Sequence, residues 1–283
     1  MSQPNPTTTG TVSLVGGGPG DPELLTVKAR RLLDEADIVF HDNLVGNGVV
    51  ESIPERTAVE NVGKRPDGER TPQAEINDLL VREARAGRDV VRLKGGDPTV
   101  FGRGGEEAEH LARHGVPFEF VPGVTSAIAA PSAAGVPPTH RDHASALAVV
   151  TGHEDPAKPD SAIDWDALAS IVSAGGTLVV LMGVGRLPDN VAALAESGVG
   201  RETPVAMVER ATLPGERTVT GTLDTIVERA RRADIEPPAV TVVGDVVGVR
   251  ETVAHCLSGG ASELGPASPA AASAEDEIEV NHQ

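Results

Sequence analysis

The chain has 283 residues, with 42 acidic and 24 basic side chains and a formal net charge of −18, a balance that excludes nucleic acid and anionic membranes as expected partners because they carry negative charge. Its single cysteine, Cys256, excludes an intrachain disulfide, and no apolar run approaches the roughly 20 residues of a membrane span, so we expect a cytoplasmic protein. The acidic excess predicts a halophilic protein, adapted to a very salty cytoplasm in which dissolved ions screen the repulsion between carboxylates.

The first half of the chain alternates short β-branched runs with helical periods that follow glycines, a pattern typical of a parallel sheet with crossover helices. Taken in chain order, the strands are expected at 12–15, 38–41, 58–62, 90–93 and 118–121, and the helices at 22–35, 73–86, 106–114 and 126–134. We assign residues 11–134 to an N-terminal α/β domain that carries the glycine-rich loops.

The second half continues the alternation, so the same parallel arrangement is expected there, in a second α/β domain over 145–252. Its strands are predicted at 147–150, 177–181, 205–208, 218–221 and 240–243, and its helices at 187–196 and 223–233. A stretch rich in Pro, Gly and charge, 135–144, suits the boundary between the two domains. The tail, 257–283, is acidic, contains no Lys or Arg and is predicted to be disordered.

Residues 16–23, Gly-Gly-Gly-Pro-Gly-Asp-Pro-Glu, connect the first strand to the first helix. They resemble a dinucleotide-binding loop, but Asp21 stands where that pattern needs its third glycine. Asp21 and Pro22 also fit the N-cap and first residue of a helix, which would place a carboxylate where a pyrophosphate has to bind. The loop therefore favours a ligand without phosphate and argues against a nucleotide-dependent oxidoreductase.

Two more loops of this kind leave strands of the first half, at 93–107 and 122–126. Gly95 and Gly96 allow a ligand to approach the backbone closely, and Asp97 can accept hydrogen bonds from hydroxyl or amino groups. Because the carboxyl ends of parallel strands meet at one edge of a sheet, we expect the three loops to lie together there.

These motifs resemble, in order and over about residues 11–252, the S-adenosylmethionine-dependent tetrapyrrole methylases; the matching segments are 15–25, 62–65, 91–107, 121–126 and 138–142. The run Arg-Leu-Lys-Gly-Gly-Asp-Pro-Thr-Val-Phe-Gly-Arg-Gly-Gly-Glu-Glu at 92–107 most resembles the members that methylate uroporphyrinogen III. The resemblance implies two α/β domains with a ligand cleft between them, a homodimer, and S-adenosylmethionine as methyl donor, leaving as S-adenosylhomocysteine.

The resemblance also implies which residues contact this cofactor: Pro19, Gly95, Gly96, Asp97, Val100, Thr125, Ser126, Met182, Ala211 and Ala239. No metal is expected, because the sulfonium supplies the electrophile. His110 and His114 stand one helical turn apart, but no third ligand accompanies them, so they are interpreted as a solvated helix face.

Asp42 and Lys64 match the acid and base proposed for the family. Without the surrounding motifs they would be interpreted as a turn aspartate and a solvated loop lysine. The implied substrate carries acetate and propionate groups, which arginine binds well through its planar fork. We therefore expect five cations to line the substrate side: Arg65, Arg103, Arg141 and Arg210, with Lys64. Each of them could equally be an ion-pair partner on an acidic surface.

The reaction implied by the resemblance is methylation of uroporphyrinogen III at carbons 2 and 7, giving precorrin-1 and then precorrin-2, which feeds sirohaem and cobalamin biosynthesis. Two alternatives remain open besides the disfavoured oxidoreductase. The first is another enzyme of the same superfamily, acting on a later precorrin or on diphthine. The second is a protein that binds cofactor or tetrapyrrole without turnover.

Overall fold

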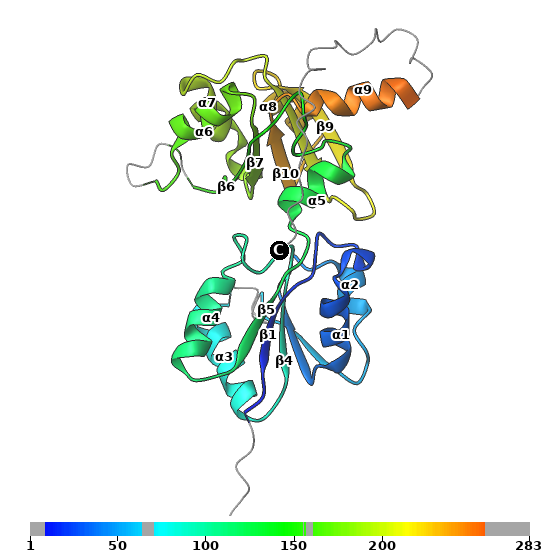
Figure 1. The fold of residues 1–283 in the computed structure, drawn as a ribbon, viewed down its shortest axis with the longest axis vertical. Coiled ribbons are helices and arrows are strands. Elements are labelled where there is room, and N and C mark those ends of the chain that lie inside the picture. Colours follow the sequence, from blue (N-terminus) through cyan, green and yellow to red (C-terminus); the bar gives the residue numbers. More distant parts are fainter. Residues whose placement is uncertain (1–8, 64–70, 155, 157–160, 258–283) are drawn as a thin grey trace, which may run out of the picture.

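The computed structural model describes residues 9–63, 71–154, 156 and 161–257, which form two five-stranded sheets placed one above the other in Figure 1. In the first sheet the strand order is β3-β2-β4-β1-β5, and every neighbouring pair is parallel, as expected. Its strands are β1 (Val12–Gly16), β2 (Ile38–His41), β3 (Ala58–Asn61), β4 (Val90–Lys94) and β5 (Phe118–Val121).

Helices cover both faces of the first sheet. On one face α1 (Val27–Glu35) and α2 (Asn47–Glu51) bury an apolar cluster that includes Leu33. On the other face α3 (Gln73–Arg85) and α4 (Gly104–Arg113) bury a second cluster around Leu80. The central strands β1 and β4 are buried along their whole length.

The second sheet is mixed, with the order β6-β7-β10-β8-β9. Only β6 and β7 run parallel, while β10 is antiparallel to both β7 and β8, and β8 is antiparallel to β9. The prediction of parallel strands throughout was therefore wrong for this half. A short loop joins β8 to β9, and such a loop can connect only antiparallel neighbours. The strands are β6 (Leu147–Thr151), β7 (Thr177–Leu181), β8 (Pro204–Glu209), β9 (Arg217–Thr222) and β10 (Ala239–Val243).

Helices also cover both faces of the second sheet. One face carries α6 (Trp165–Ser173), α7 (Leu187–Glu196) and α8 (Ile226–Arg232). The other packs against α5 (Ser126–Ala133) and the start of α9 (Val247–Leu257). We expected α5 to belong with the first half, but its alanines pack on β7, β8 and β10 of the second sheet, to which it lies close in Figure 1.

Several helix boundaries differ from the predicted ones. The helix expected over 22–35 divides into a 3₁₀ turn, η1 (Pro22–Leu24), and α1, because Asp21 and Thr26 each cap a separate start. The helices α2, α6 and α9, and the 3₁₀ turn η2 (Val184–Arg186), were not predicted. Leu257, assigned to the tail, is the last residue of α9, and the rest of the predicted tail lies outside the described residues.

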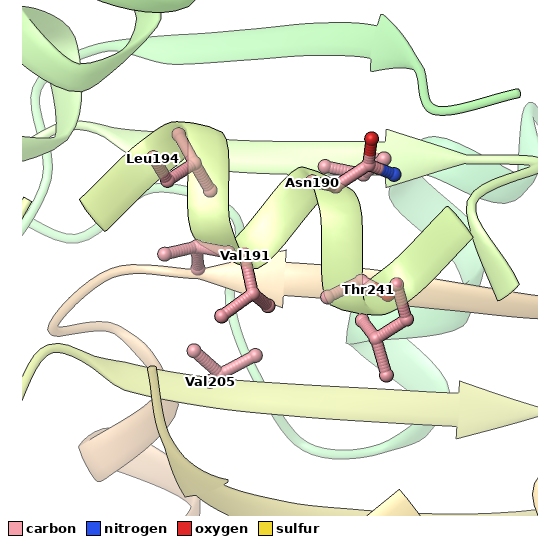
Figure 2. Close-up of a pocket in the computed structure, with 8 residues that line it drawn as sticks. Asn190, Val191, Leu194, Val205 and Thr241 are labelled. Carbon is pink, nitrogen blue, oxygen red and sulfur yellow. The ribbon is translucent and has the colours of Figure 1, made fainter. Parts of the chain in front are cut away.

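A cavity of about 10 Å³ lies inside the second half, between α7 and the sheet (Figure 2). Asn190 and Thr241 are the polar residues of its otherwise apolar lining. Its volume is about that of one water-sized sphere, so it cannot hold an organic ligand. The candidate site has to be sought at the strand ends instead.

Candidate active site

The three glycine-rich loops of the first sheet are bonded to one another. The amide of Gly96 donates to the carbonyl of Gly18 at 2.7 Å, and the amide of Gly18 donates back at 3.1 Å. A Cβ added to Gly16 would lie 2.5 Å from the amide nitrogen of Gly123, so this close approach requires glycine. The loops after β1, β4 and β5 therefore form one surface, as the parallel arrangement predicted.

Polar side chains hold this surface together. Asp97 accepts from the amide of Thr99 at 2.8 Å through Oδ1 and from the amide of Gly123 at 3.1 Å through Oδ2. Thr125 is the N-cap of α5 and accepts from the amide of Ala127. Seven of the expected cofactor residues lie on these loops or at the start of α5: Pro19, Gly95, Gly96, Asp97, Val100, Thr125 and Ser126.

The remaining three expected cofactor residues lie together at one edge of the second sheet. Met182 directly follows β7, and Ala211 lies just beyond the end of β8. Ala239 begins β10 and pairs in register with Glu209, the last residue of β8. Because β10 is antiparallel to β7 and β8, its first residue lies beside their ends. The strand reversal that the sequence did not predict is thus what brings Ala239 to this edge.

The loops of the two sheets meet at Leu213, between β8 and β9. A Cβ added to Gly20 would lie 2.6 Å from Cδ2 of Leu213. A Cβ on Gly46, in the loop after β2, would lie 2.3 Å from the carbonyl oxygen of Gly20. Loops following β1, β2 and β8 are therefore in direct contact, and the candidate residues of both halves face a common region.

Left-handed backbone conformations concentrate in these loops. Such conformations cost about 1–3 kcal/mol each in non-glycine residues and cluster at functional sites. Among the described residues six non-glycine residues adopt them, and all except Asp234 lie in the loops after β4, β7 and β8: Phe101, Arg103, Met182, Arg210 and Thr212.

The surface fits the cofactor that the sequence implied. Leu44, Phe101 and Met182 are exposed apolar side chains on loops of the two facing edges, and such a surface suits an adenine ring or a macrocycle. Gly96, with a φ of 67°, leaves backbone accessible to a ligand. Asp21 accepts from the amide of Glu23 at the start of η1, so a carboxylate occupies the helix start that a pyrophosphate would need.

Asp42 directly follows β2 and belongs to a cluster of four charged side chains. Nη2 of Arg92 donates to Oδ1 of Asp42 at 2.7 Å, and Nζ of Lys94 lies 3.7 Å from Oδ2. Nε of Arg92 and Nζ of Lys94 each donate to Oε1 of Glu107 at 3.0 Å. Nε2 of Gln73 donates to the same oxygen at 3.1 Å. Asp42 is the most exposed of the four charged side chains, at 28%.

Burial and neighbouring charges shift the pKa values of the two cations in this cluster. Arg92 is 1% exposed, Lys94 3% and Glu107 0%. Burial disfavours the charged form of Arg92, but the charges of Glu107 and Asp42 outweigh it and raise the pKa of the guanidinium. Burial and then the charge of Arg92 lower the pKa of the Lys94 ammonium, against the opposing pull of Glu107 and Asp42.

Sequence reasoning assigned no role to Arg92, Lys94 or Glu107. A signal was nevertheless present, because two cations at alternate positions of an otherwise apolar central strand must lie on the same buried face. A buried cation requires an anionic partner, and Glu107 on α4 provides it.

The cationic residues predicted to bind substrate differ in position and contacts. Lys64 and Arg65 lie outside the described residues. Arg103 makes a two-point ion pair with Glu106, at 2.9 and 2.6 Å, which raises the pKa of the guanidinium. Arg210 is exposed at the end of β8.

Arg141 is not brought together with the other candidates. It lines a groove of about 510 Å³ formed with residues 142–146, the end of α6 and Gly176. Ala146 and Gly176 precede β6 and β7, so this groove lies at the edge of the second sheet opposite Met182. The position of Arg141, away from the other candidate residues, does not support a substrate role, which stays a prediction.

Within the part of the chain that the structure describes, no group of three His, Cys, Asp or Glu side chains is placed to hold a metal ion. His110 pairs with Asp78, and Nδ1 of His114 lies 2.8 Å from the carbonyl oxygen of His110. In the same residues no helix combines the length and the apolar character needed to cross a membrane.

Comparison with known proteins points to one family. A family model described as Tetrapyrrole (Corrin/Porphyrin) Methylases matches residues 11–227. The S-adenosyl-L-methionine-dependent uroporphyrinogen III methyltransferase of Methanosarcina barkeri is 50% identical over 250 residues, which cover 88% of this chain and 97% of that protein.

Two further relatives extend the comparison. The siroheme synthase of Neisseria meningitidis serogroup B is 47% identical over 254 residues, but these are only 51% of its length, so the chain spans about half of that protein. The crystal structure of uroporphyrin-III C-methyl transferase from Thermus thermophilus, complexed with S-adenyl homocysteine, is 46% identical with a TM-score of 0.72, covering 85% of this chain and all of that one.

Proposed function

The chain belongs to the tetrapyrrole (corrin/porphyrin) methylase family, and we propose that it methylates carbons 2 and 7 of uroporphyrinogen III, giving precorrin-1 and then precorrin-2. It is an S-adenosylmethionine-dependent methyltransferase that acts on uroporphyrinogen III. The observation that carries the detailed proposal is the meeting of the glycine-rich loops, the β8–β9 loop and Asp42 in one region.

The residues of both sheets would hold the cofactor by backbone and apolar contacts. Gly95, Gly96 and the start of α5 offer backbone on one side, and Met182, Ala211 and Ala239 complete the surface on the other. When bound, S-adenosylmethionine supplies an electrophilic methyl group on its sulfonium sulfur. Fixing its position against the ring is the main contribution of the protein, because orientation lowers the entropic part of the barrier.

Asp42 accepts a proton in this proposal. Each transfer adds a methyl group as a cation to the electron-rich ring, so one proton has to leave the ring for each methyl added. The Asp42 carboxylate is partly exposed at the loop edge and is held by Arg92, which suits a base that meets the substrate. Lys64, which lies outside the described residues, remains proposed as the second group for proton transfer.

Arg103 and Arg210 are proposed to bind the substrate carboxylates, together with Arg65. Both described arginines lie on the facing loops and have left-handed backbone conformations. Arg103 has to exchange Glu106 for a substrate carboxylate, and that exchange costs little because the pair is exposed to solvent.

Further features of the protein belong to the same proposal. We propose a cytoplasmic homodimer that works at high salt and consists of an N-terminal and a C-terminal α/β domain, whose product feeds sirohaem and cobalamin biosynthesis. The net charge of −18 supports the preference for salt. The match covers about half of the Neisseria siroheme synthase, and none of the chemistry of its other half is assigned to this chain.

The test is an anaerobic incubation of the protein in molar salt with uroporphyrinogen III and S-adenosylmethionine, followed by mass spectrometry. We expect a gain of two methyl groups, and release of one S-adenosylhomocysteine for each. Asp42→Asn is expected to lose the activity, whereas the same substitution at the exposed Asp142, in the groove at the opposite edge, is expected to retain it.

Other outcomes of this experiment favour the rival functions. Turnover with a later precorrin but not with uroporphyrinogen III would favour another enzyme of the superfamily. Tight binding of S-adenosylhomocysteine without turnover on any tetrapyrrole would favour a binding protein.

A further inference from the structure

Asp42 and three buried charged side chains, Arg92, Lys94 and Glu107, form a cluster whose position stability alone does not explain. Arg92 is among the largest fully buried side chains of the described residues, and Glu107 is completely buried. Buried ion pairs are costly to desolvate, and well-packed apolar residues in their place are often as stable or more stable. Two of the buried cations, Arg92 and Lys94, contact the candidate base Asp42, so a functional reason has to be sought in that contact.

The two cations contact the carboxylates of Asp42 and Glu107 in different ways. Both carboxylate oxygens of Asp42 face a cation, Oδ1 facing Arg92 and Oδ2 facing Lys94. In contrast, the three donors that reach Glu107 all share Oε1, and Oε2 of Glu107 is buried without a hydrogen-bond partner. Glu107 thus anchors the two cations, while the two cations fix the orientation of Asp42.

Building on the function proposed above, we propose that Arg92 and Lys94 are positioning residues for the base, holding the Asp42 carboxylate ionised and oriented toward the ring, with Glu107 as their buried counter-ion. With all four side chains ionised the cluster carries no net charge. When Asp42 takes up the proton that the methylated ring releases, the cluster becomes cationic in a buried setting, which drives the proton on to solvent through the exposed side of Asp42. The base is thereby returned to its ionised form before the second transfer.

Charged groups from each neighbouring element contribute to this behaviour. Arg92 and Lys94 come from β4, Glu107 from α4, and His41, beside Asp42 on β2, places its Nδ1 3.1 Å from the Asp42 carbonyl oxygen. Lys64 and Arg65 precede α3 in the sequence and lie outside the described residues. Burial and the charge of Arg92 lower the pKa of the Lys94 ammonium, which agrees with a cation held there at some cost.

The inference predicts opposite effects from two substitutions within one cluster. Lys94→Met removes a positive charge beside Asp42 and is expected to move the pH midpoint of the Asp42 carboxyl titration upward by about one unit. Glu107→Gln removes a negative charge that offsets the same cations and is expected to move it downward by a similar amount, about one unit. In the double variant the two shifts are expected largely to cancel.

The measurement is carbon NMR of protein labelled in its aspartates, titrated with S-adenosylhomocysteine present and at fixed salt. Asp42→Asn identifies the signal. The acidic limb of the kcat profile is expected to follow the same shifts. The matched control is Glu83→Gln, which removes a buried carboxylate that also pairs with two cations, Arg82 and Arg88, at the far end of α3. It is expected to leave the midpoint unchanged.

Shifts in the same direction, or no shift in folded variants, would overturn the inference. If Lys94→Met does not fold, the Glu107→Gln variant alone tests the inference. An unchanged midpoint of the Asp42 titration in that variant would contradict the role of the cluster. The NMR titration does not require turnover. Absence of methyl transfer by the unmodified protein would therefore refute the proposed function without deciding the role of Arg92 and Lys94.

Discussion

Leu213, in the loop between β8 and β9, occupies the space that a side chain on Gly20 would need. A Cβ on Gly20 would lie 2.6 Å from Cδ2 of Leu213, and Gly20 has a φ of 138° that residues other than glycine rarely adopt. The contact joins the first glycine-rich loop to the loop that carries Arg210 and Ala211. It is therefore a direct mechanical link between the two halves of the candidate site.

Gly20→Ala is expected to weaken binding at the site by displacing the β8–β9 loop. We expect the dissociation constant for S-adenosylhomocysteine and the KM for uroporphyrinogen III to rise about tenfold, which corresponds to about 1.4 kcal/mol. Calorimetric titration and steady-state kinetics in molar salt measure the two constants.

Two further variants separate this displacement from backbone strain. Gly115 has a φ of 67°, but a Cβ added to it would meet no other atom within 4 Å, so Gly115→Ala introduces strain without a clash and is expected to leave both constants unchanged. Adding Leu213→Ala to Gly20→Ala is expected to recover part of the affinity. Equal losses in the Gly20 and Gly115 variants would contradict the proposed link.

Asn190 ties α7 to the loop between β6 and α6. Its Nδ2 donates to the carbonyl of Gly152 at 3.0 Å, and Figure 2 shows its side chain beside the small cavity under α7. Asn190→Ala leaves that buried carbonyl without its donor and is expected to lower the free energy of unfolding by about 1–3 kcal/mol.

Denaturant unfolding at fixed salt measures the effect of Asn190→Ala. The exposed Asn47 at the start of α2 provides the control, since Asn47→Ala is expected to change the free energy of unfolding by no more than about 0.5 kcal/mol. A loss at Asn190 no larger than the loss at Asn47 would show that the hydrogen bond to Gly152 contributes nothing.

Glu209, at the end of β8, makes the stability of the second sheet depend on pH. The hydrogen bond from Arg217 lowers the pKa of Glu209, so the folded protein favours the ionised carboxylate more strongly than the unfolded chain does. This contribution is complete above the ordinary glutamate pKa of about 4.3 and is lost as the pH falls through the lower folded value.

The difference in Tm between the unmodified protein and Glu209→Gln is therefore expected to be largest near neutral pH and to shrink below about pH 4. Calorimetry across this range measures it, with the exposed Glu202→Gln as the control for removal of a surface charge. A difference that grows on acidification would reverse the sign and refute the interpretation.

The positions of most strands could be predicted because they are short runs rich in β-branched residues, which suit a buried strand. Their directions in the second sheet could not, since a strand has the same composition whichever way it runs. The packing of α5 was missed for a related reason: its sequence, Ser-Ala-Ile-Ala-Ala-Pro-Ser-Ala, consists mostly of small residues and has no side that favours one sheet over the other. The caps Asp21 and Thr26 were the local signal that the first helix is divided.

The site was predictable where glycine and loop chemistry determine it, and the structure brings those loops together. The buried cluster was not, because charged residues in a sequence are usually interpreted as surface, and only the pairing of β2 with β4 places Arg92 beside Asp42. Arg141 lies apart from the other arginines although it belongs to a motif in the sequence, and its substrate role stays a prediction.

The most direct test of the whole account is the position of the transferred carbon. Anaerobic reaction with S-adenosylmethionine labelled with ¹³C in its methyl group, followed by carbon NMR of the product, reports each new bond separately. The account predicts two labelled methyl groups, each on a saturated ring carbon, at positions 2 and 7. A single methyl group, a methyl group on nitrogen or oxygen, or an unlabelled tetrapyrrole would contradict it.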